Sequence, residues 1–362
     1  MAAVSPHAAV VGGSLTGLCA GLALARAGWQ VTIIERAAGE PPGGAGLGLD
    51  RGLLSRVTGV DASAIPVISG NRDSAAWGLV RQFLLEIALR ADGVKVIESV
   101  TVTGVHQPDG GRQVLDSTAG PLAADVIVGA DGVYSVTRRF VAPEQPAARY
   151  AGYMLWRGLV SEAAVPGGLG GRGSNLEIHA ADGAQLVIYC VPGADGRTGP
   201  GHRRVSYAWY DGSRTDMLRE TGCVQGDTVA ATLRADQLPA GLVGELDWFA
   251  RQHWPEPWGR CISWGVTHQE VFGTPVAEYL PPRLVRDRVA LAGDAAHVAS
   301  PMTGAGFQNA LLDVAALAAC LADADAAIVP EFLARYEQKR LSQARQLVSS
   351  GMSWGRSYLS SL

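Results

Sequence analysis

The chain has 362 residues, of which 48% are hydrophobic, and a formal net charge of -4. This length allows a large core and about two domains, while the acidic balance and the lack of a Lys/Arg block argue against nucleic acid or a membrane surface as partner. Five cysteines without C-x-x-C or metal-type spacing predict free thiols, no metal site and a cytoplasmic protein. No apolar run reaches about 18 residues and no signal peptide precedes the first strand, so no membrane span is expected.

The first predicted unit, residues 8–36, is a strand, a glycine turn, a helix and a second strand. Its turn "GGSLTG" matches the dinucleotide pattern G-x-G-x-x-G at Gly12 and Gly17, with Ser14 at the middle glycine. Serine is small, and its hydroxyl can bind a phosphate oxygen at the helix N-terminus. We therefore expect a working dinucleotide site rather than an ordinary turn.

Glu35 ends the second strand, where an acidic residue accepts hydrogen bonds from ribose hydroxyls and repels a 2′-phosphate. The fingerprint alone does not distinguish NAD from FAD.

The next predicted elements are a helix over 77–93 and a strand over 124–132. From 150 to 271 the runs become short, aromatic-rich and separated by Gly, Asp and Pro, which predicts an antiparallel sheet; "CISWGVTHQEVF" (261–272) is taken as one of its strands. Residues 288–321 return to α/β character, and the chain closes on a helical pattern.

A second acidic turn in "VALAGDAAH" (289–297) leads into a Gly-rich turn and a helix. An NAD enzyme has no need of this second site. A flavin does, because its ribityl chain and ring extend beyond the pyrophosphate and require their own acceptor and backbone N–H groups. The pattern therefore favours FAD.

Three motifs in this order resemble the class A flavoprotein aromatic hydroxylases, typified by p-hydroxybenzoate hydroxylase. They are the fingerprint at 12–17, "GADGVYSVTR" with Asp131, and Gly293-Asp294 followed by P-x-x-G-x-G at 301–306, and together they cover nearly the whole chain. "LWRGLV" and "YAWYDG" are similar to the hydroxypyridine-hydroxylase branch. That branch carries Arg-Pro-His where this chain has Ser-Pro-Met at 300–302, so a larger apolar aromatic substrate fits as well as a hydroxypyridine.

The resemblance implies an α/β fold: a Rossmann-like FAD-binding domain with an inserted antiparallel β-sheet substrate domain and C-terminal helices. We expect the FAD-binding domain at 1–149 and 273–330, the substrate domain at 150–272 with a contribution from about 60–76, and a C-terminal helical segment at 331–362.

By the same resemblance, Asp294 would hold the ribityl hydroxyls, the amides at 304–306 would face the flavin pyrimidine edge, and Arg81 and Arg51 would contact FAD. The expected cofactor set is Gly12, Gly13, Ser14, Leu15, Gly17, Glu35, Arg36, Arg51, Arg81, Asp131, Gly293, Asp294, Pro301, Gly304, Ala305 and Gly306.

The resemblance further implies that NAD(P)H reduces FAD, that dioxygen adds to form a flavin C4a-hydroperoxide, and that an electron-rich aromatic or heteroaromatic small molecule is hydroxylated. Epoxidation, Baeyer–Villiger insertion and a non-redox FAD-containing cyclase stay open as alternatives, as do the choice of NADH or NADPH and a homodimer.

Candidates for a catalytic base are weak. Alternation in two strands places His179 with Glu177 on one face, and Tyr189 on one face of the next strand. For His179, Tyr189 and Tyr210 we favour a packing role over catalysis, and His297 is expected to support the Gly-Asp turn.

Overall fold

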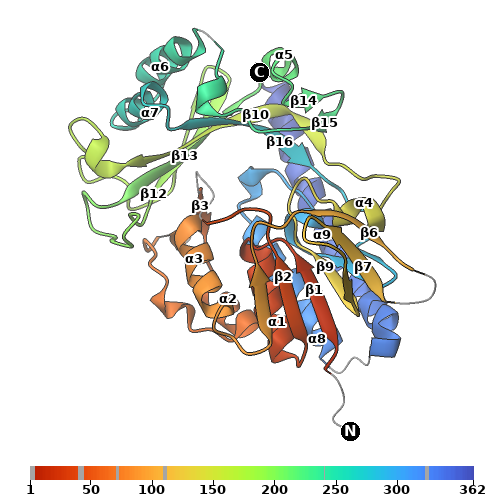
Figure 1. Cartoon of the computed structure of the whole chain (residues 1–362). Coiled ribbons are helices and arrows are strands. Elements are labelled where there is room, and N and C mark those ends of the chain that lie inside the picture. Colours follow the sequence, from red (N-terminus) through yellow and green to blue (C-terminus); the bar gives the residue numbers. More distant parts are fainter. Residues whose placement is uncertain (1–4, 40–44, 71–72, 109–111, 240, 323–325) are drawn as a thin grey trace.

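The computed structural model describes residues 5–39, 45–70, 73–108, 112–239, 241–322 and 326–362. Two domains lie one above the other, and the long last helix, α9 (Val329–Ser360), runs along both (Figure 1). Among the described helices, none combines the length and the apolar character needed to cross a membrane.

The lower domain is built on a six-stranded sheet. From one edge to the other, its strands are β17 (Val285–Arg286), β18 (Val289–Leu291), β9 (Val126–Gly129), β1 (His7–Val11), β2 (Gln30–Ile34) and β5 (Val94–Ile97). All neighbours are parallel except β17 and β18. The central strands are continuous runs of Val, Ile and Ala because both of their faces are buried.

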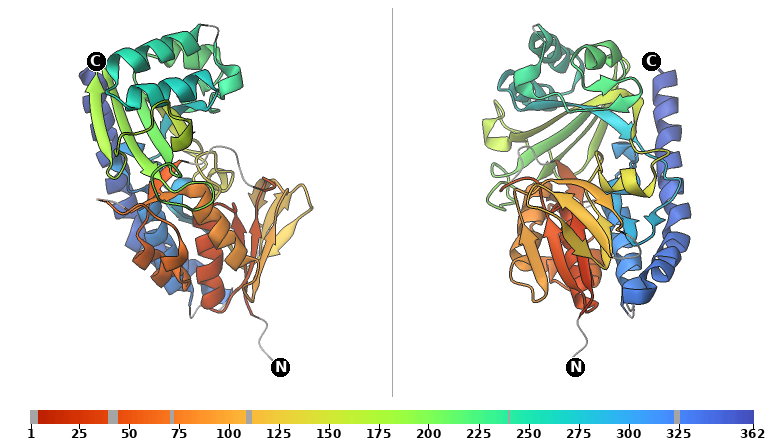
Figure 2. Two further views of the ribbon diagram at one scale, coloured as in Figure 1. Left: turned by 90° about the vertical axis from the view of Figure 1, so that its left-hand side faces the viewer. Right: turned by 45° about the vertical axis from the view of Figure 1, so that its right-hand side comes forward.

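Helices cover one face of this sheet, and a small antiparallel sheet lies on the other (Figure 2). The helices are α1 (Leu15–Arg26), α2 (Arg51–Thr58), α3 (Trp77–Ala88) and α8 (Gly306–Leu321). The small sheet consists of β6 (Val102–His106), β7 (Gln113–Ser117) and β8 (Leu122–Ala124). α1 contacts the other three helices, and α8 also contacts α9.

The upper domain contains a seven-stranded, antiparallel sheet, as the short aromatic-rich runs predict. Its strands, from one edge, are β11 (Glu177–Ala181), β12 (Ala184–Val191), β13 (Arg204–Asp211), β10 (Arg149–Ser161), β15 (Thr228–Val229) and β14 (Val224–Gln225), with β16 (Val271–Glu278) also paired to β10. Three helices belong to this domain: α5 (Thr215–Glu220), α6 (Leu242–His253) and α7 (Trp258–Thr267).

The two faces of the upper sheet have different neighbours. On one face, side chains such as Trp156 and Trp209 form a buried core with α6 and α7. On the opposite face, Tyr210 packs with Tyr358 of α9, and Ser206 accepts a hydrogen bond from the backbone N–H of Gly46 in the lower domain, 3.0 Å from N to Oγ. This second face is therefore turned toward the lower domain.

The prediction of a strand over 261–272 was wrong. Most of that segment is α7, and the strand β16 begins only at Val271 and continues to Glu278, past the expected domain boundary at 272. Trp258, Cys261, Ile262 and Val266 recur at helical spacing and are all buried against the sheet. Trp, Ile and Val also favour strands, so the sequence was interpreted as a strand although the spacing of these residues is helical.

A short strand pair joins the lower domain to the upper sheet. β3 (Gly46–Gly48) pairs with β4 (Ser74–Ala76), and β4 packs against β12. The end of the 60–76 segment thus contacts the upper domain, although the domain limits themselves stay a prediction.

Candidate functional site

A cavity of about 570 Å³ lies in the lower domain, where the parallel strands end. Four of its lining residues follow four of those strands: Gly12 after β1, Glu35 after β2, Asp131 after β9 and Asp294 after β18. In open α/β sheets, ligands bind outside the carboxyl ends of the strands. The three sequence motifs therefore meet at one cavity.

The two retained fingerprint glycines are required by close backbone contacts. A Cβ on Gly17 would lie 1.8 Å from the carbonyl oxygen of Gly12, and one on Gly12 would lie 2.4 Å from the carbonyl oxygen of Ala130. Gly12 also has φ +106°. These contacts bring α1 against the strands and leave its N-terminus facing the cavity.

Ser14 occupies the N-cap of α1 and lines the cavity. Its side chain makes no capping hydrogen bond, so the hydroxyl is available to a phosphate together with the first N–H groups of the helix.

Glu35 also lines the cavity, but its carboxylate is already engaged with the backbone. Its Oε2 accepts from the N–H of Gly13 (2.6 Å) and its Oε1 from the N–H of Ala37 (2.8 Å). Glu35 therefore fixes the fingerprint turn, and its contact with a ribose stays a prediction. The adjacent Arg36 and Leu15 line the cavity as well.

Asp131 holds its own loop in shape. Its carboxylate accepts from the N–H groups of Val136 (2.7 Å) and Thr137 (3.1 Å) at the start of α4 (Thr137–Val141), and from the hydroxyl of Ser135 (2.6 Å). One side of the residue still borders the cavity.

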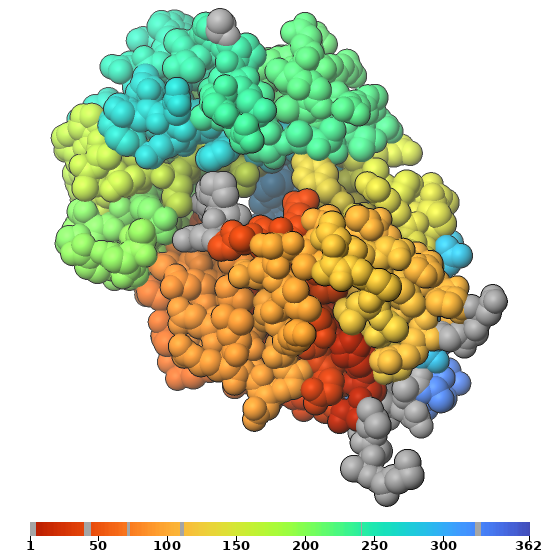
Figure 3. Space-filling model, in the orientation of Figure 1, coloured from red at the N-terminus to blue at the C-terminus, as the bar shows by residue number. Residues whose placement is uncertain are grey.

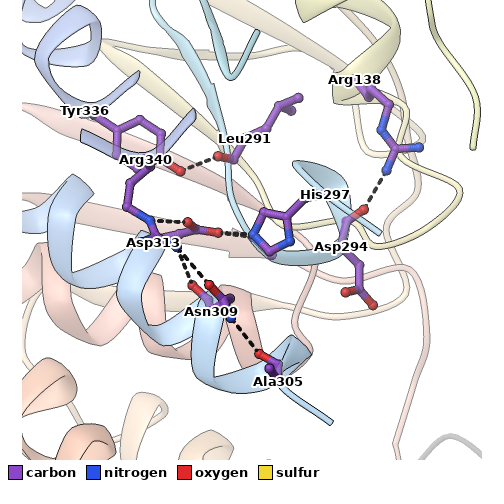
Figure 4. Close-up of polar contacts among 10 residues, drawn as sticks. Arg138, Leu291, Asp294, His297, Ala305, Asn309, Asp313, Tyr336 and Arg340 are labelled. Carbon is purple, nitrogen blue, oxygen red and sulfur yellow. Dashed lines mark hydrogen bonds and ion pairs between the residues drawn. The ribbon is translucent and has the colours of Figure 1, made fainter. Parts of the chain in front are cut away.

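Arg138 ties this loop to the Gly-Asp turn. Its buried guanidinium donates to the carbonyl oxygen of Asp294 at 2.5 Å (Figure 4). It also donates to the carbonyl oxygens of Ala295 (2.8 Å) and Val133 (2.9 Å), and it lies over the ring of Tyr279 at 4.1 Å. The second and third motifs thus act as one rigid unit.

Asp294 opens onto the cavity with its carboxylate while its backbone is held by Arg138 (Figure 4). The side chain is open to the cavity, yet the surrounding protein keeps much of the bulk water away and so raises the pKa of this carboxyl, while the nearby His297 and Arg138 act in the opposite direction. A carboxyl placed in this way is a suitable acceptor for ligand hydroxyls.

Behind this turn lies a buried network formed by His297, Asp313 and Arg340 (Figure 4). The Asp313 carboxylate accepts hydrogen bonds from His297 Nε2 (2.7 Å), from Arg340 Nε (2.8 Å) and from the backbone N–H of Gly293 (3.0 Å). Burial by itself would lower the pKa of His297 and raise that of Asp313, but their attraction outweighs burial and shifts both pKa values the opposite way. The charged network clamps the Gly-Asp turn to α8 and α9, as the supporting role expected of His297 requires.

The two predicted arginine contacts lie in different places. Arg81 on α3 is buried, lines the cavity and donates from Nε to the carbonyl oxygen of Gly13 at 3.2 Å. Arg51 on α2 is absent from the cavity lining and instead pairs with Asp73 at 3.7 Å. The structure therefore brings Arg81, and not Arg51, to the cavity.

A second helix N-terminus faces the cavity. Gly306, Phe307 and Ala310 of α8 line it, preceded by Gly304 with φ +55° and by the turn Pro301–Thr303. Six further residues of the predicted cofactor set lie next to the cavity in sequence but do not line it: Gly13, Gly17, Gly293, Pro301, Gly304 and Ala305.

The cavity fits FAD. One helix N-terminus with a free serine hydroxyl suits a pyrophosphate, and a second, beside the Asp294 carboxylate, suits the ribityl chain and the polar edge of a flavin. The Ser14 region would hold the pyrophosphate. Asp294 and the start of α8 would hold the ribityl chain and the polar edge of the flavin.

The three candidate bases lie on different faces of the upper sheet. His179 and Glu177 pair with Leu186 and Ile188, so they lie on the face covered by α6 and α7, where His179 Nε2 contacts Glu177 at 3.0 Å. The structure therefore does not bring His179 to the cofactor side.

Tyr189 and Tyr210 lie on the opposite face, toward the lower domain. A Cβ on Gly46 would lie 2.5 Å from the Tyr189 ring, and Tyr210 is buried within an aromatic cluster with Tyr153, Trp354 and Tyr358. Burial raises the pKa of Tyr210 far above its usual value, so its hydroxyl stays protonated near neutral pH.

Two family models match the chain: one described as "FAD binding domain-like" over residues 150–255, and one described as "FAD binding domain" over residues 265–350. The 3-amino-4-hydroxybenzoate 2-monooxygenase of Streptomyces cremeus is 31% identical over 250 residues, which cover 67% of this chain and only 52% of that relative. The 2,6-dihydroxypyridine 3-monooxygenase of Paenarthrobacter nicotinovorans is 26% identical over 350 residues, covering 88% of this chain and 83% of the relative.

The solved structure of 2,6-dihydroxypyridine-3-hydroxylase from Arthrobacter nicotinovorans has the same fold, with a TM-score of 0.78 and 24% identity over 96% of this chain and 91% of that one. The fold and the cavity, together with these family matches, define an FAD-binding protein. The chain is similar to FAD-dependent aromatic monooxygenases along most of its length.

Sequence reasoning missed several residues of the site. Asp313 is a single acid in the apolar helix pattern "NALLDVAAL", a signal that could have marked it as buried and paired. The cavity is also lined by Trp77, Phe307 and Tyr134. Sequence analysis did not select them because it relied on the glycines and polar residues of each motif.

Proposed function

We propose that this protein uses NAD(P)H and dioxygen to hydroxylate a small electron-rich aromatic compound. The balanced reaction consumes one aromatic C–H compound, one dioxygen, one NAD(P)H and one proton, and gives the hydroxylated aromatic, NAD(P)⁺ and water. Bound FAD supplies the redox and oxygen-transfer chemistry.

One observation carries the proposal: the turn before α8, whose N-terminus lines the cavity, packs on an aromatic face of the upper sheet. Met302, in the turn that leads into α8, packs against the cluster containing Tyr210, Leu155 and Tyr153. The hydroxyl of Tyr153 donates to Ser300 Oγ at 2.9 Å and so fixes this turn to the sheet. An aromatic substrate at this contact would lie between apolar walls, where water is excluded.

The chain's residues would orient the substrate rather than perform oxygen transfer. Tyr210 can donate a hydrogen bond near neutral pH but cannot act as a base there, because its pKa is raised. The names of relatives that act on aminohydroxybenzoate, hydroxybenzoate and dihydroxypyridine support a ring that carries a hydroxyl group.

The test is an aerobic screen of phenols, hydroxybenzoates and hydroxypyridines for stimulated NAD(P)H oxidation by the FAD-loaded protein. Product mass under ¹⁸O₂ and hydrogen peroxide yield are measured together. We expect at least one compound to give a product 18 mass units heavier than the compound itself, with little peroxide. Labelled epoxide or ester products would instead assign epoxidation or Baeyer–Villiger insertion, and product formation without NAD(P)H consumption would assign a non-redox reaction.

A further inference from the structure

His297 and Arg340 share a single carboxylate in the interior of the lower domain. Nε2 of His297 lies 2.7 Å from Oδ2 of Asp313, and Nε of Arg340 lies 2.8 Å from Oδ1 of the same side chain. Within the described part of the chain, neither His297 nor Arg340 has a second carboxylate at ion-pair distance. These three residues, the Asp313 network, therefore hold one acidic group for two basic groups.

Water cannot screen the charges of this network. The side chains of His297, Asp313 and Arg340 are 1%, 0% and 8% exposed. A hollow opens between the two domains on one face of the molecule (Figure 3), whereas the Asp313 network is enclosed by the Gly-Asp turn, α8 and α9. A charge in such an interior acts more strongly on its surroundings than a charge in water.

The surroundings of His297 favour its imidazolium form. Its ring contacts the Asp313 carboxylate and lies on the path from there to Asp294, a second acidic residue (Figure 4). Burial by itself lowers the pKa of His297, but the attraction of Asp313 and then of Asp294 outweighs burial and raises the pKa. Asp313 itself stays ionised, because Arg340 and the N–H of Gly293 also bind its carboxylate. With His297 protonated, the Asp313 network carries one excess positive charge.

The Asp313 network lies behind two walls of the cofactor cavity. One wall is Asp294, three residues before His297, and the other is the N-terminus of α8, the helix that carries Asp313. These are the walls that suit the ribityl chain and the polar edge of a flavin. The three residues of the network do not line the cavity themselves. Their charge would therefore act on the flavin through space rather than by contact.

A positive charge at this place favours the reduced flavin. Reduction adds two electrons and one proton to the flavin ring, which then carries a negative charge near neutral pH. Charges near the ring are one of the means by which a protein tunes a flavin. An excess positive charge attracts the reduced ring and has little effect on the uncharged, oxidised ring.

We propose that Asp313 holds His297 as an imidazolium and that the charge of His297 raises the reduction potential of the bound FAD. This role goes beyond the clamping of the Gly-Asp turn. It rests on FAD binding and not on the proposed hydroxylation, so its test needs no aromatic substrate.

The test compares the reduction potential of FAD in the loaded wild type and in His297→Gln. The glutamine amide can still donate a hydrogen bond to Asp313 but carries no charge. Potentials are measured near neutral pH during slow reduction by xanthine and xanthine oxidase, with a reference dye. We expect the ratio of the affinities for reduced and oxidised FAD to fall about 10-fold, which lowers the two-electron potential by about 30 mV. The Kd of oxidised FAD should change little.

Two further variants separate charge from packing. His268→Gln is the matched control, because it removes an exposed histidine at the end of α7 in the upper domain, and it should leave the potential unchanged. Arg340→Gln removes the other cation of the Asp313 network and should lower the potential in the same direction as His297→Gln. Thermal melting checks the fold of each variant.

The protonation of His297 is measured directly by ¹⁵N NMR of the loaded wild type with labelled histidine. The chain has seven histidines, so the His297 signal is identified by elimination with Gln variants of the other six. We expect both ring nitrogens of His297 to be protonated near neutral pH.

The proposal is overturned if His297→Gln keeps the wild-type potential, or if His268→Gln lowers it as much. Equal losses of affinity for oxidised and reduced FAD would leave His297 as a structural clamp only. A neutral imidazole at His297 in the wild type also overturns the proposal, even where His297→Gln does not hold FAD. The expected potentials in a protein that hydroxylates no aromatic compound would refute the proposed function and support this role of His297.

Discussion

His297 Nε2 lies 2.7 Å from Asp313 Oδ2, and both side chains are at most 1% exposed. This pair joins the turn that carries Asp294 to α8, whose N-terminus forms another wall of the same cavity. Because Arg340 of α9 contacts the other oxygen of Asp313, three segments distant in sequence fix this end of the cavity.

Removal of the charge on Asp313 should therefore destabilise the whole FAD-binding domain. Asp313→Asn leaves His297 and Arg340 without their anion, and we expect the free energy of unfolding to fall by about 3–5 kcal/mol. Urea unfolding followed by tryptophan fluorescence measures the change. Asp216→Asn, at a side chain 94% exposed, is the matched control and should change stability by less than about 0.5 kcal/mol. A similar small effect of Asp313→Asn would mean that the network carries no net stabilisation.

Gly17 and Ser14 should respond in opposite ways to substitution. Gly17→Val places a side chain where even a Cβ would lie 1.8 Å from a backbone oxygen, so α1 must move and FAD should be lost. Ser14→Gly restores the commoner glycine and should retain FAD. The FAD content per chain after gel filtration is the measurement, with Gly244→Val, at a helical glycine with open space around it, as control. Equal FAD content in all three would place the pyrophosphate elsewhere.

Asp294 should matter more for flavin function than His179. Asp294→Ala removes the carboxylate that faces the cavity, whereas His179 lies on the opposite side of the upper sheet. We expect Asp294→Ala to weaken FAD binding and to lower coupled turnover about a hundredfold, since a displacement of about 1 Å is enough for such a loss. His179→Ala should leave both nearly unchanged. Product, peroxide and NAD(P)H oxidation are measured for both variants, and the reverse ranking would move the site to the helix-covered face.

Glu278 should make stability depend on pH. Among the described residues its Oε1 has no hydrogen-bond partner, and burial raises its pKa to about 7, with Arg356 acting in the opposite direction. A glutamate in the unfolded chain has a pKa of about 4.3. Between pH 4.3 and 7, roughly, the folded state therefore holds a proton that the unfolded state has lost, and the free energy of unfolding falls as pH rises.

Glu278→Gln removes this titration. We expect it to stabilise the protein by about 1–2 kcal/mol at pH 8, after allowance for the partial exposure of the group, and to have little effect at pH 5. Thermal melting at both pH values measures the difference, with the exposed Glu220→Gln as control. An equal shift at both pH values would show that the effect of Glu278 is not one of charge.

The sequence by itself determined the cofactor end of the molecule. Gly17 is imposed by a contact with Gly12 inside one βαβ unit, Gly12 has a φ of +106° in the turn of that unit, and Asp294 follows a buried strand after a short turn, so their roles depend on neighbours a few residues away or on a fixed turn geometry. Such local requirements leave a recognisable spacing in the chain, and in the structure residues of all three motifs line one cavity.

The tertiary structure alone decided the substrate side. Which face of the sheet His179 or Tyr189 occupies depends on strand register and on which face α6 and α7 cover, and α7 itself was mistaken for a strand because its apolar side chains suit both periods.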